Sequence, residues 1–169
     1  MRNYFAKMRG EMLSPPRPAK AHIFCSSLGA LLGISATAYL AHLSNVPLLM
    51  APFGASAVLA FAVPDSPLSQ PRNIIGGHVL GTAVGLVFMT FLGTNWWALA
   101  LAVASAIALM QITKTLHAPA GADPLVVMTA HASWSFILTP ALAGSMILVL
   151  IALVFNNLVS SRSYPKYWR

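Results

Sequence analysis

Six apolar segments separated by short polar links are the most regular feature of this chain. Two of them, 48–63 and 118–138, are interrupted near their start by proline and glycine. The other four are continuous and cover 21–43, 73–93, 96–113 and 140–159. About 20 apolar residues suffice to cross a membrane as a helix. The pattern predicts an all-α integral membrane protein, a small helical bundle in which the order long, broken, long occurs twice.

The two interruptions have matching sequences. Residues 51–56 read Ala-Pro-Phe-Gly-Ala-Ser, and residues 118–123, 67 positions later, read Ala-Pro-Ala-Gly-Ala-Asp. Non-helical backbone at membrane depth is tolerated only where protein covers it or where it lines a wet cavity. Matching breaks in the two halves of a hydrophobic chain indicate a transport site. The sequence therefore predicts that the two breaks meet near the middle of the membrane.

The composition supports a lipid-facing surface. Of the 169 residues, 57% are hydrophobic and 8% are charged, whereas soluble domains have roughly 25% charged residues. The net charge of +7 comes from ten Lys and Arg against three acids, Glu11, Asp65 and Asp123. The basic residues flank the apolar segments, as topology signals do, and do not form the patch expected of a nucleic-acid-binding protein. The single cysteine, Cys25, excludes an internal disulfide.

Three regions follow from this pattern. Residues 1–20 form a basic cytoplasmic leader that includes Arg2, and 161–169 form a basic aromatic tail that ends in Arg169. Residues 21–160 form one transmembrane domain, with repeat one at about 21–93 and repeat two at about 94–160. The apolar run 21–43 is too long for a cleaved signal peptide, so it is predicted to be a retained helix.

Two topologies are compatible with the segments. If the broken segments cross the membrane, there are six crossings in an inverted three-plus-three repeat, and all ten Lys and Arg lie on one side. If the broken segments are re-entrant half-helices, there are four full spans, and Arg72 and Lys114 lie outside. The rule that positive charge stays in the cytoplasm favours the six-crossing topology.

The candidate site consists of the two breaks and the side chains beside them. A helix that begins inside the membrane presents free backbone N–H groups and a partial positive charge, which together attract an anion. Ser56 and Asp123 are interpreted as N-caps, and Gly54 and Gly121 as positions of close backbone approach. The predicted substrate-binding residues are Pro52, Phe53, Gly54, Ala55, Ser56, His117, Pro119, Gly121, Ala122 and Asp123.

Several roles remain open at this point. Asp123 is a helix cap, a protonated acid in a proton-linked mechanism, or a cation ligand. His117 is a proton relay or anion contact, or it ties the broken backbone. His78 shares a helix face with Gly81 and Gly85, which favours an interhelical hydrogen bond. A possible vestibule comprises Arg72, Lys114, His78 and His131.

The same residues resemble a known family. The stretches Ala-Pro-Phe-Gly-Ala-Ser (51–56), Ser-Pro-Leu-Ser-Gln-Pro-Arg-Asn-Ile-Ile-Gly-Gly-His (66–78) and Thr-Leu-His-Ala-Pro-Ala-Gly-Ala (115–122) are similar to the HPP family of small integral membrane proteins. The resemblance covers about 20–160 and implies four transmembrane helices and, from chloroplast and cyanobacterial relatives, nitrite transport. The chain departs from the His-Pro-Pro motif of the family name, because it has His117-Ala118-Pro119.

The predicted function is a transporter or channel for a small monovalent anion such as nitrite, with proton linkage, in the bacterial inner membrane. The alternatives are a cation or metal carrier that uses Asp123 and histidines, and a structural or assembly subunit. Neither paired carboxylates nor a nucleophile beside a base are visible in the sequence, so no enzyme, metal or cofactor is predicted. The expected partners are the lipid bilayer, a small anion and other copies of the chain.

Overall fold

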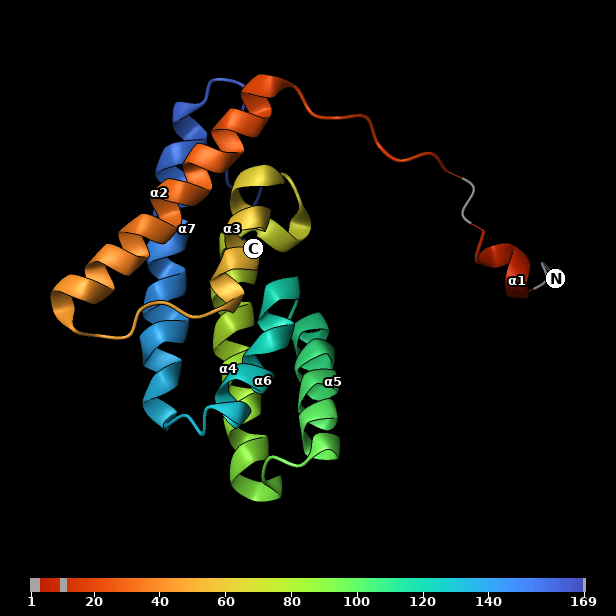
Figure 1. Cartoon of the computed structure of the whole chain (residues 1–169), viewed down its shortest axis with the longest axis vertical. Helices are drawn as coiled ribbons and strands as arrows, with labels where there is room; N and C mark the ends of the chain where they lie inside the picture. Colours follow the sequence, from red (N-terminus) through yellow and green to blue (C-terminus); the bar gives the residue numbers. More distant parts are fainter. Residues whose placement is uncertain (1–3, 10–11, 169) are drawn as a thin grey trace.

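The computed structural model describes residues 4–9 and 12–168 as a bundle of helices, with a short N-terminal helix α1 (Tyr4–Lys7) held apart from it (Figure 1). Arg2, Glu11 and Arg169 lie outside the described residues. The bundle contains the helices α2 (Lys20–Ser44), α3 (Pro52–Ala62), α4 (Pro71–Leu92), α5 (Trp96–Ile112), α6 (Asp123–Thr129) and α7 (Ala143–Leu158). Four shorter helical pieces connect them, η1 (Pro67–Ser69), η2 (Ala118–Ala122), η3 (Trp134–Ile137) and η4 (Leu138–Leu142).

The predicted all-helical membrane architecture is confirmed, with three stretches that are long and apolar enough to span a membrane within the described residues. These are Lys20–Ser44, Pro71–Leu92 and Trp134–Leu158, the last of which includes a kink at Thr139. The broken segments are shorter than predicted. At 1.5 Å per residue, the 11 residues of α3 and the 7 of α6 extend about 16 Å and about 10 Å. Neither half-helix alone crosses a hydrocarbon core of about 30 Å.

The basic residues of the bundle gather at one end. Arg72, in the first turn of α4, donates to Thr113 O beside Lys114 at 2.8 Å. Arg162 follows α7 and donates to Phe61 O in the last turn of α3 at 2.9 Å. His22, in the first turn of α2, contacts Ala62 O at 3.0 Å. The starts of α2 and α4 and the ends of α3, α5 and α7 therefore lie at this end, which is called the basic end below.

The fifth segment, predicted as one interrupted helix over 118–138, is divided into η2, α6 and η3. α6 ends because His131 adopts a left-handed backbone, with φ of 48°. Ala132 N then donates back to Val127 O at 2.9 Å, the pattern of a Schellman stop. The sixth segment also begins later than predicted, since α7 starts at Ala143 and Pro140 belongs to η4.

Small residues allow the helices to approach closely. A Cβ added at Gly29 or Gly33 of α2 would lie 2.5 Å or 2.9 Å from the Phe61 ring of α3. Gly77, Gly81 and Gly85 form one face of α4 against η2 and α6. Both glycine faces are thus in contact with other elements of the same chain.

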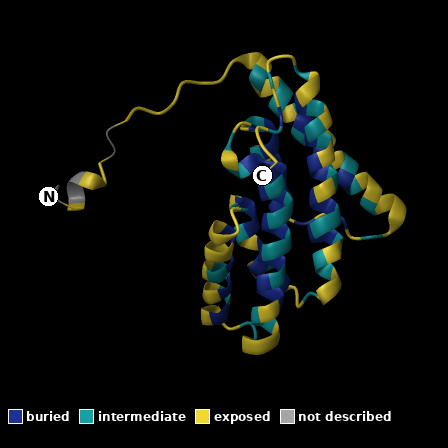
Figure 2. Ribbon diagram, turned by 180° about the vertical axis from the view of Figure 1, so that it is seen from behind, coloured by how far each residue is buried: buried dark blue, intermediate teal, exposed yellow. Residues whose placement is uncertain are grey.

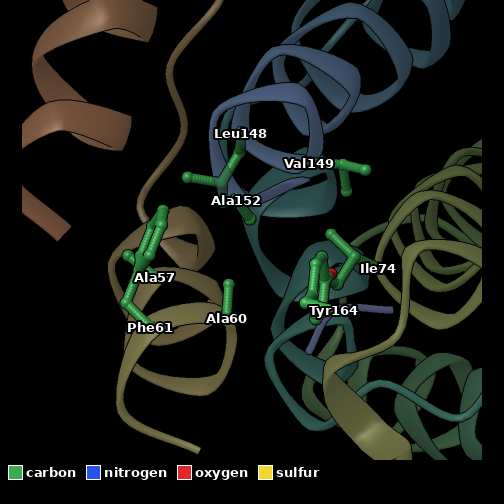
Figure 3. Close-up of a cluster of buried hydrophobic side chains, with 8 residues drawn as sticks. All are labelled: Ala57, Ala60, Phe61, Ile74, Leu148, Val149, Ala152 and Tyr164. Carbon is green, nitrogen blue, oxygen red and sulfur yellow. The ribbon is translucent and has the colours of Figure 1, made fainter. Parts of the chain in front are cut away.

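The main apolar core lies among α3, α4, α7 and the C-terminal tail (Figure 3). Its fully or nearly fully buried side chains are Ala57, Ala60, Phe61, Ile74, Leu148, Val149, Ala152 and Tyr164. Buried positions face inward along each helix, and exposed positions occupy the outer faces and the loops (Figure 2). An apolar outer face is the arrangement expected where lipid is the solvent.

The tail docks against the link between α3 and α4. Tyr164 is 2% exposed and its hydroxyl donates to Ser69 O at 2.7 Å. Tyr167 is exposed and donates to Pro67 O at 3.0 Å, and Lys166 N donates to Gln70 Oε1 at 2.8 Å. Burial raises the pKa of the Tyr164 phenol.

Candidate functional site

A continuous chain of hydrogen bonds joins the two breaks through α4. Asp123 Oδ2 lies 2.8 Å from His78 Nδ1, and His78 Nε2 lies 2.7 Å from Ser56 Oγ. Ser56 Oγ also lies 2.8 Å from His117 Nε2, and His117 Nδ1 lies 2.7 Å from Leu68 O. The side chains of Ser56, His78, His117 and Asp123 are fully buried. We call these four side chains the polar cluster.

Ser56 enters the polar cluster because α3 begins at Pro52. Proline is favourable in the first turn of a helix, since that turn needs no N–H from it. Ser56 then lies in the second turn, on the buried face with Phe53 and Ala60. Its hydroxyl contacts Pro52 O at 3.3 Å and both imidazoles. The prediction that Ser56 is an N-cap is therefore wrong.

Asp123 is also not the predicted N-cap. It is the first residue of α6, the cap position is Ala122, and no side chain caps this helix. Pro124 follows Asp123 and has no N–H to donate to Ala120 O, so Asp123 N bonds Ala120 O in the tighter 3₁₀ pattern. The carboxyl group of Asp123 points instead to His78 on α4.

The glycine face of α4 brings the second break within reach of His78. A Cβ added at Gly81 would lie 2.5 Å from Ala120 O and 3.4 Å from Asp123 Oδ2. A Cβ added at Gly77 would lie 2.7 Å from His117 Cβ. The rings of His78 and His117 consequently pack edge to face, with centroids 5.0 Å apart. The predicted interhelical hydrogen bond of His78 is confirmed. Its ring contacts Ser56 of α3 through Nε2 and Asp123 of α6 through Nδ1.

The free amides predicted at the start of α3 already have partners. Phe53 N donates to Met50 O at 3.0 Å, and Gly54 N donates to Ala51 O at 3.2 Å. Phe53 is buried, and its ring packs against His78 with a centroid distance of 5.0 Å. The structure therefore gives Phe53 a packing role beside the polar cluster.

Two hollows flank the breaks. One of about 420 Å³ lies between them and is lined by Ala55, Val58, Leu59, Ala118 and Pro119. These residues include the chain neighbours of Ser56 and His117. The other, of about 310 Å³, lies at the start of α3 and includes Gly54 among its lining residues. A Cβ added at Gly54 or Gly121 meets nothing within 4 Å, so the space beside both glycines is open. Ala122 is exposed beside Gly121.

The predicted vestibule residues separate into different roles. Lys114 has φ of 57° and ends α5, with Thr115 N donating to Met110 O at 2.8 Å, the same stop that His131 provides for α6. Lys114 is exposed at the basic end beside the half-buried Arg72. His131 is exposed after α6 and has no contact with the polar cluster. Only His78 of the four belongs to the cluster.

Sequence reasoning missed three features of the site. The Leu68 carbonyl is a backbone group without a sequence signal, yet it accepts from His117. Arg162 binds Phe61 O, Asn156 Oδ1 and Ser26 Oγ at the basic end, although only its charge was visible in the sequence. Asp123 Oδ1 and Thr82 Oγ1, one helical turn beyond His78, are buried without a hydrogen-bond partner among the described residues.

The contacts among Ser56, His78 and Asp123 have the connectivity of a serine hydrolase triad. The sequence shows no nucleophile beside a base, whereas the structure places Ser56 Oγ 2.7 Å from His78 Nε2 and Asp123 Oδ2 2.8 Å from His78 Nδ1. The hydroxyl of Ser56 is fully buried and is held between two imidazoles, whereas a nucleophilic serine must face its substrate. Within the described residues, no group of three or more His, Cys, Asp or Glu side chains is arranged to hold a metal ion.

Comparisons with known proteins agree with the membrane architecture. The family model described as "HPP, transmembrane region" matches residues 15–165. A transmembrane protein of Dictyostelium discoideum is 41% identical over 179 residues, which cover 98% of this chain and 63% of that protein. A second transmembrane protein from the same organism is 39% identical over 177 residues, covering 98% of this chain and 57% of its own length.

This chain therefore spans about three fifths of the length of these curated relatives. A search of solved structures gives no match. The family model covers nearly all of the helical bundle, including both breaks and every member of the polar cluster. The chain belongs to the HPP family of transmembrane proteins.

Proposed function

We propose that this protein is a transporter or channel for a small monovalent anion such as nitrite, linked to proton movement. The proposal depends on one observation: Ser56 of the first break hydrogen-bonds His117 of the second and reaches Asp123 through His78. Ionisable side chains buried in a membrane bundle are costly and indicate a substrate or proton pathway. The relatives supply no activity, so the anion is inferred from the site and from the family resemblance.

The charges and hollows support passage of an anion. The hollow between the breaks lies directly beside Ser56 and His117. Lys20, Arg72, Lys114, Arg162 and Lys166 lie toward the basic end and would raise the local concentration of anions there. From the positive-inside rule we infer that this end, and both chain termini, face the cytoplasm. The inner membrane of a bacterium is the proposed location.

The directions of the half-helices support an inverted repeat. From the level of His78, α3 runs toward the basic end, where Ala62 O meets His22. α6 runs the opposite way, because Pro124 and Val127 pack at Gly85 and Met128 joins the cluster of Leu86. Two half-helices that begin together and diverge are typical of inverted-repeat transporters. Because the chain is small, we expect several copies to assemble in the bilayer.

Ser56→Ala tests the proposal in liposomes that contain the full chain. Wild-type protein is expected to take up nitrite above empty vesicles, and Ser56→Ala is expected to reduce that rate at least tenfold, because it disconnects the breaks. Ser145→Ala is the matched control, since Ser145 is equally buried but bonds only Leu142 O at 2.9 Å. Uptake of cations alone would instead support the carrier that uses Asp123 and histidines. Absence of any flux would favour an assembly subunit.

A further inference from the structure

The direction of every hydrogen bond in the polar cluster follows from the Leu68 carbonyl, which contacts His117 at the end of the chain of hydrogen bonds. Leu68 O is a carbonyl oxygen and can only accept, so His117 Nδ1 carries the proton of that bond. A neutral imidazole has one N–H, which leaves His117 Nε2 as an acceptor. Ser56 therefore donates its single hydroxyl proton to His117 Nε2, 2.8 Å away, in preference to Pro52 O at 3.3 Å.

The same rule applies to the other half of the cluster. With its proton committed to His117, Ser56 Oγ accepts from His78 Nε2, which must carry a proton. His78 Nδ1 then faces Asp123 Oδ2 across 2.8 Å with one proton between them. That proton lies either on the carboxyl group beside a neutral imidazole, or on the imidazole beside a carboxylate. Both arrangements contain the same number of protons.

A second observation favours the neutral arrangement. Asp123 Oδ1 is buried and has no hydrogen-bond partner among the described residues. A buried carboxylate with one oxygen lacking a donor is costly, whereas a carboxylic acid leaves only an uncharged carbonyl oxygen unpaired. The elements that surround Asp123 supply no compensating cation, because α3, η2, α5, α6 and α7 contain no Lys or Arg. Arg72 of α4 is bound to Thr113 O at the basic end.

We propose that Asp123, His78, Ser56 and His117 form a proton path whose hydrogen bonds are ordered at rest from Asp123, the proton-binding group, to the Leu68 carbonyl at its exit. The role of this path in coupling anion uptake to proton movement rests on the transport function proposed above. The order of its hydrogen bonds does not depend on that function. The path leads from the centre of the bundle to the link between α3 and α4, at the basic end.

Movement of one proton along the path takes four linked proton transfers. The Oδ2–H bond of Asp123 breaks as His78 Nδ1–H forms, and His78 Nε2–H breaks as its proton moves to Ser56 Oγ. Ser56 gives its original proton to His117 Nε2, which leaves a carboxylate and an imidazolium at the two ends. His117 then releases its Nδ1 proton to water near Leu68. After the release, a lone pair of His117 Nδ1 would face a lone pair of Leu68 O across 2.7 Å. The Leu68 carbonyl must therefore move away or become hydrated.

The first test needs no substrate. Nitrogen-15 NMR of the full chain in lipid is expected to show opposite tautomers, with the proton on Nδ1 in His117 and on Nε2 in His78. Infrared spectra are expected to show the C=O band of a buried carboxylic acid, which disappears in Asp123→Asn. The asparagine keeps an N–H donor for His78 Nδ1, so both tautomers are expected to persist. Matching tautomers, or an acid band that survives the substitution, would overturn the path.

The second test measures coupling in liposomes loaded with the full chain. An inward proton gradient is expected to accelerate nitrite uptake by wild-type protein and by Ser145→Ala. In Asp123→Asn the acceleration is expected to fall at least tenfold. Nitrite uptake that still follows the gradient in Asp123→Asn would reject the path while leaving the anion function intact. Opposite tautomers and the acid band without nitrite uptake would support the path and reject the proposed anion.

Discussion

The two breaks share the sequence Ala-Pro-x-Gly-Ala but differ in conformation and in what they contribute. The first opens the regular helix α3 and gives the polar cluster a single hydroxyl, that of Ser56. The second forms the 3₁₀ turn η2, with His117 before it and Asp123 after it. The titratable groups thus gather at the less regular break, while the regular helix supplies a neutral connection between the imidazoles.

The residue two positions after the second motif explains the difference. α3 has no proline after Pro52, so its amides continue the helical pattern. In the second copy Pro124 removes the N–H that an α-helix would direct to Ala120 O. The side chain of Asp123, the residue before this additional proline, turns from its own helix end to His78 of α4. A shared motif therefore does not ensure a shared geometry.

The largest expected effect is that of Gly81→Ala in α4. It tests whether the residues around the breaks, and not the glycines inside them, determine how closely the helices approach. Gly81→Ala places a methyl group 2.5 Å from Ala120 O, a backbone atom that cannot move alone. We expect a loss of about 3 kcal/mol in the free energy of unfolding, at the upper end of overpacking effects. Thermal and denaturant unfolding in detergent micelles would measure it.

The glycines inside the motifs are the controls for that substitution. Gly54→Ala and Gly121→Ala meet nothing within 4 Å. In α3 the alanine is expected to raise the free energy of unfolding by up to about 1 kcal/mol, because alanine favours a helix. Equal losses at Gly81 and Gly54 would show that the motif glycines, and not α4, set the close approach.

Pro124→Ala is expected to have a smaller effect and would reduce the difference between the breaks. The new N–H can donate to Ala120 O, so η2 and α6 are expected to join as one α-helix. We expect the free energy of unfolding to change by no more than about 1 kcal/mol. The new amide of residue 124, which proline lacks, is expected to exchange its hydrogen slowly. Rapid exchange of this amide would show that packing against α4 fixes the 3₁₀ turn.

Much of the fold, but less of the site, was accessible from the sequence. Hydropathy located the segments, and proline and glycine located both breaks. The role of Asp123 was not accessible, because a cap and a long-range hydrogen bond begin with the same acid before the same proline. Ser56 carried a usable signal: it shares the buried helical stripe of Phe53 and Ala60, where a polar group needs a partner. The Leu68 carbonyl had no signal of its own.

The last pair of substitutions concerns the link between α3 and α4, which follows the first break and contacts His117 before the second. Tyr164 and Tyr167 hold the carbonyls on either side of Leu68, those of Ser69 and Pro67. Tyr164→Phe removes one hydrogen bond and is expected to cost about 1 kcal/mol. Tyr167→Phe is expected to cost less, since Tyr167 is exposed. Unfolding in micelles would rank the two variants.

Alkaline pH tests the same contact without a substitution. The folded protein holds the Tyr164 proton more tightly than the unfolded chain does, because burial raises the pKa of that phenol. The associated stability is present below the ordinary tyrosine pKa of about 10 and is lost as the pH rises above it. Tyrosinate absorbance is therefore expected to show a delayed titration in wild-type protein that Tyr164→Phe lacks. If both proteins titrate alike, the Tyr164 hydroxyl is not held in a buried contact with Ser69 O, and the tail does not fix the link beside Leu68.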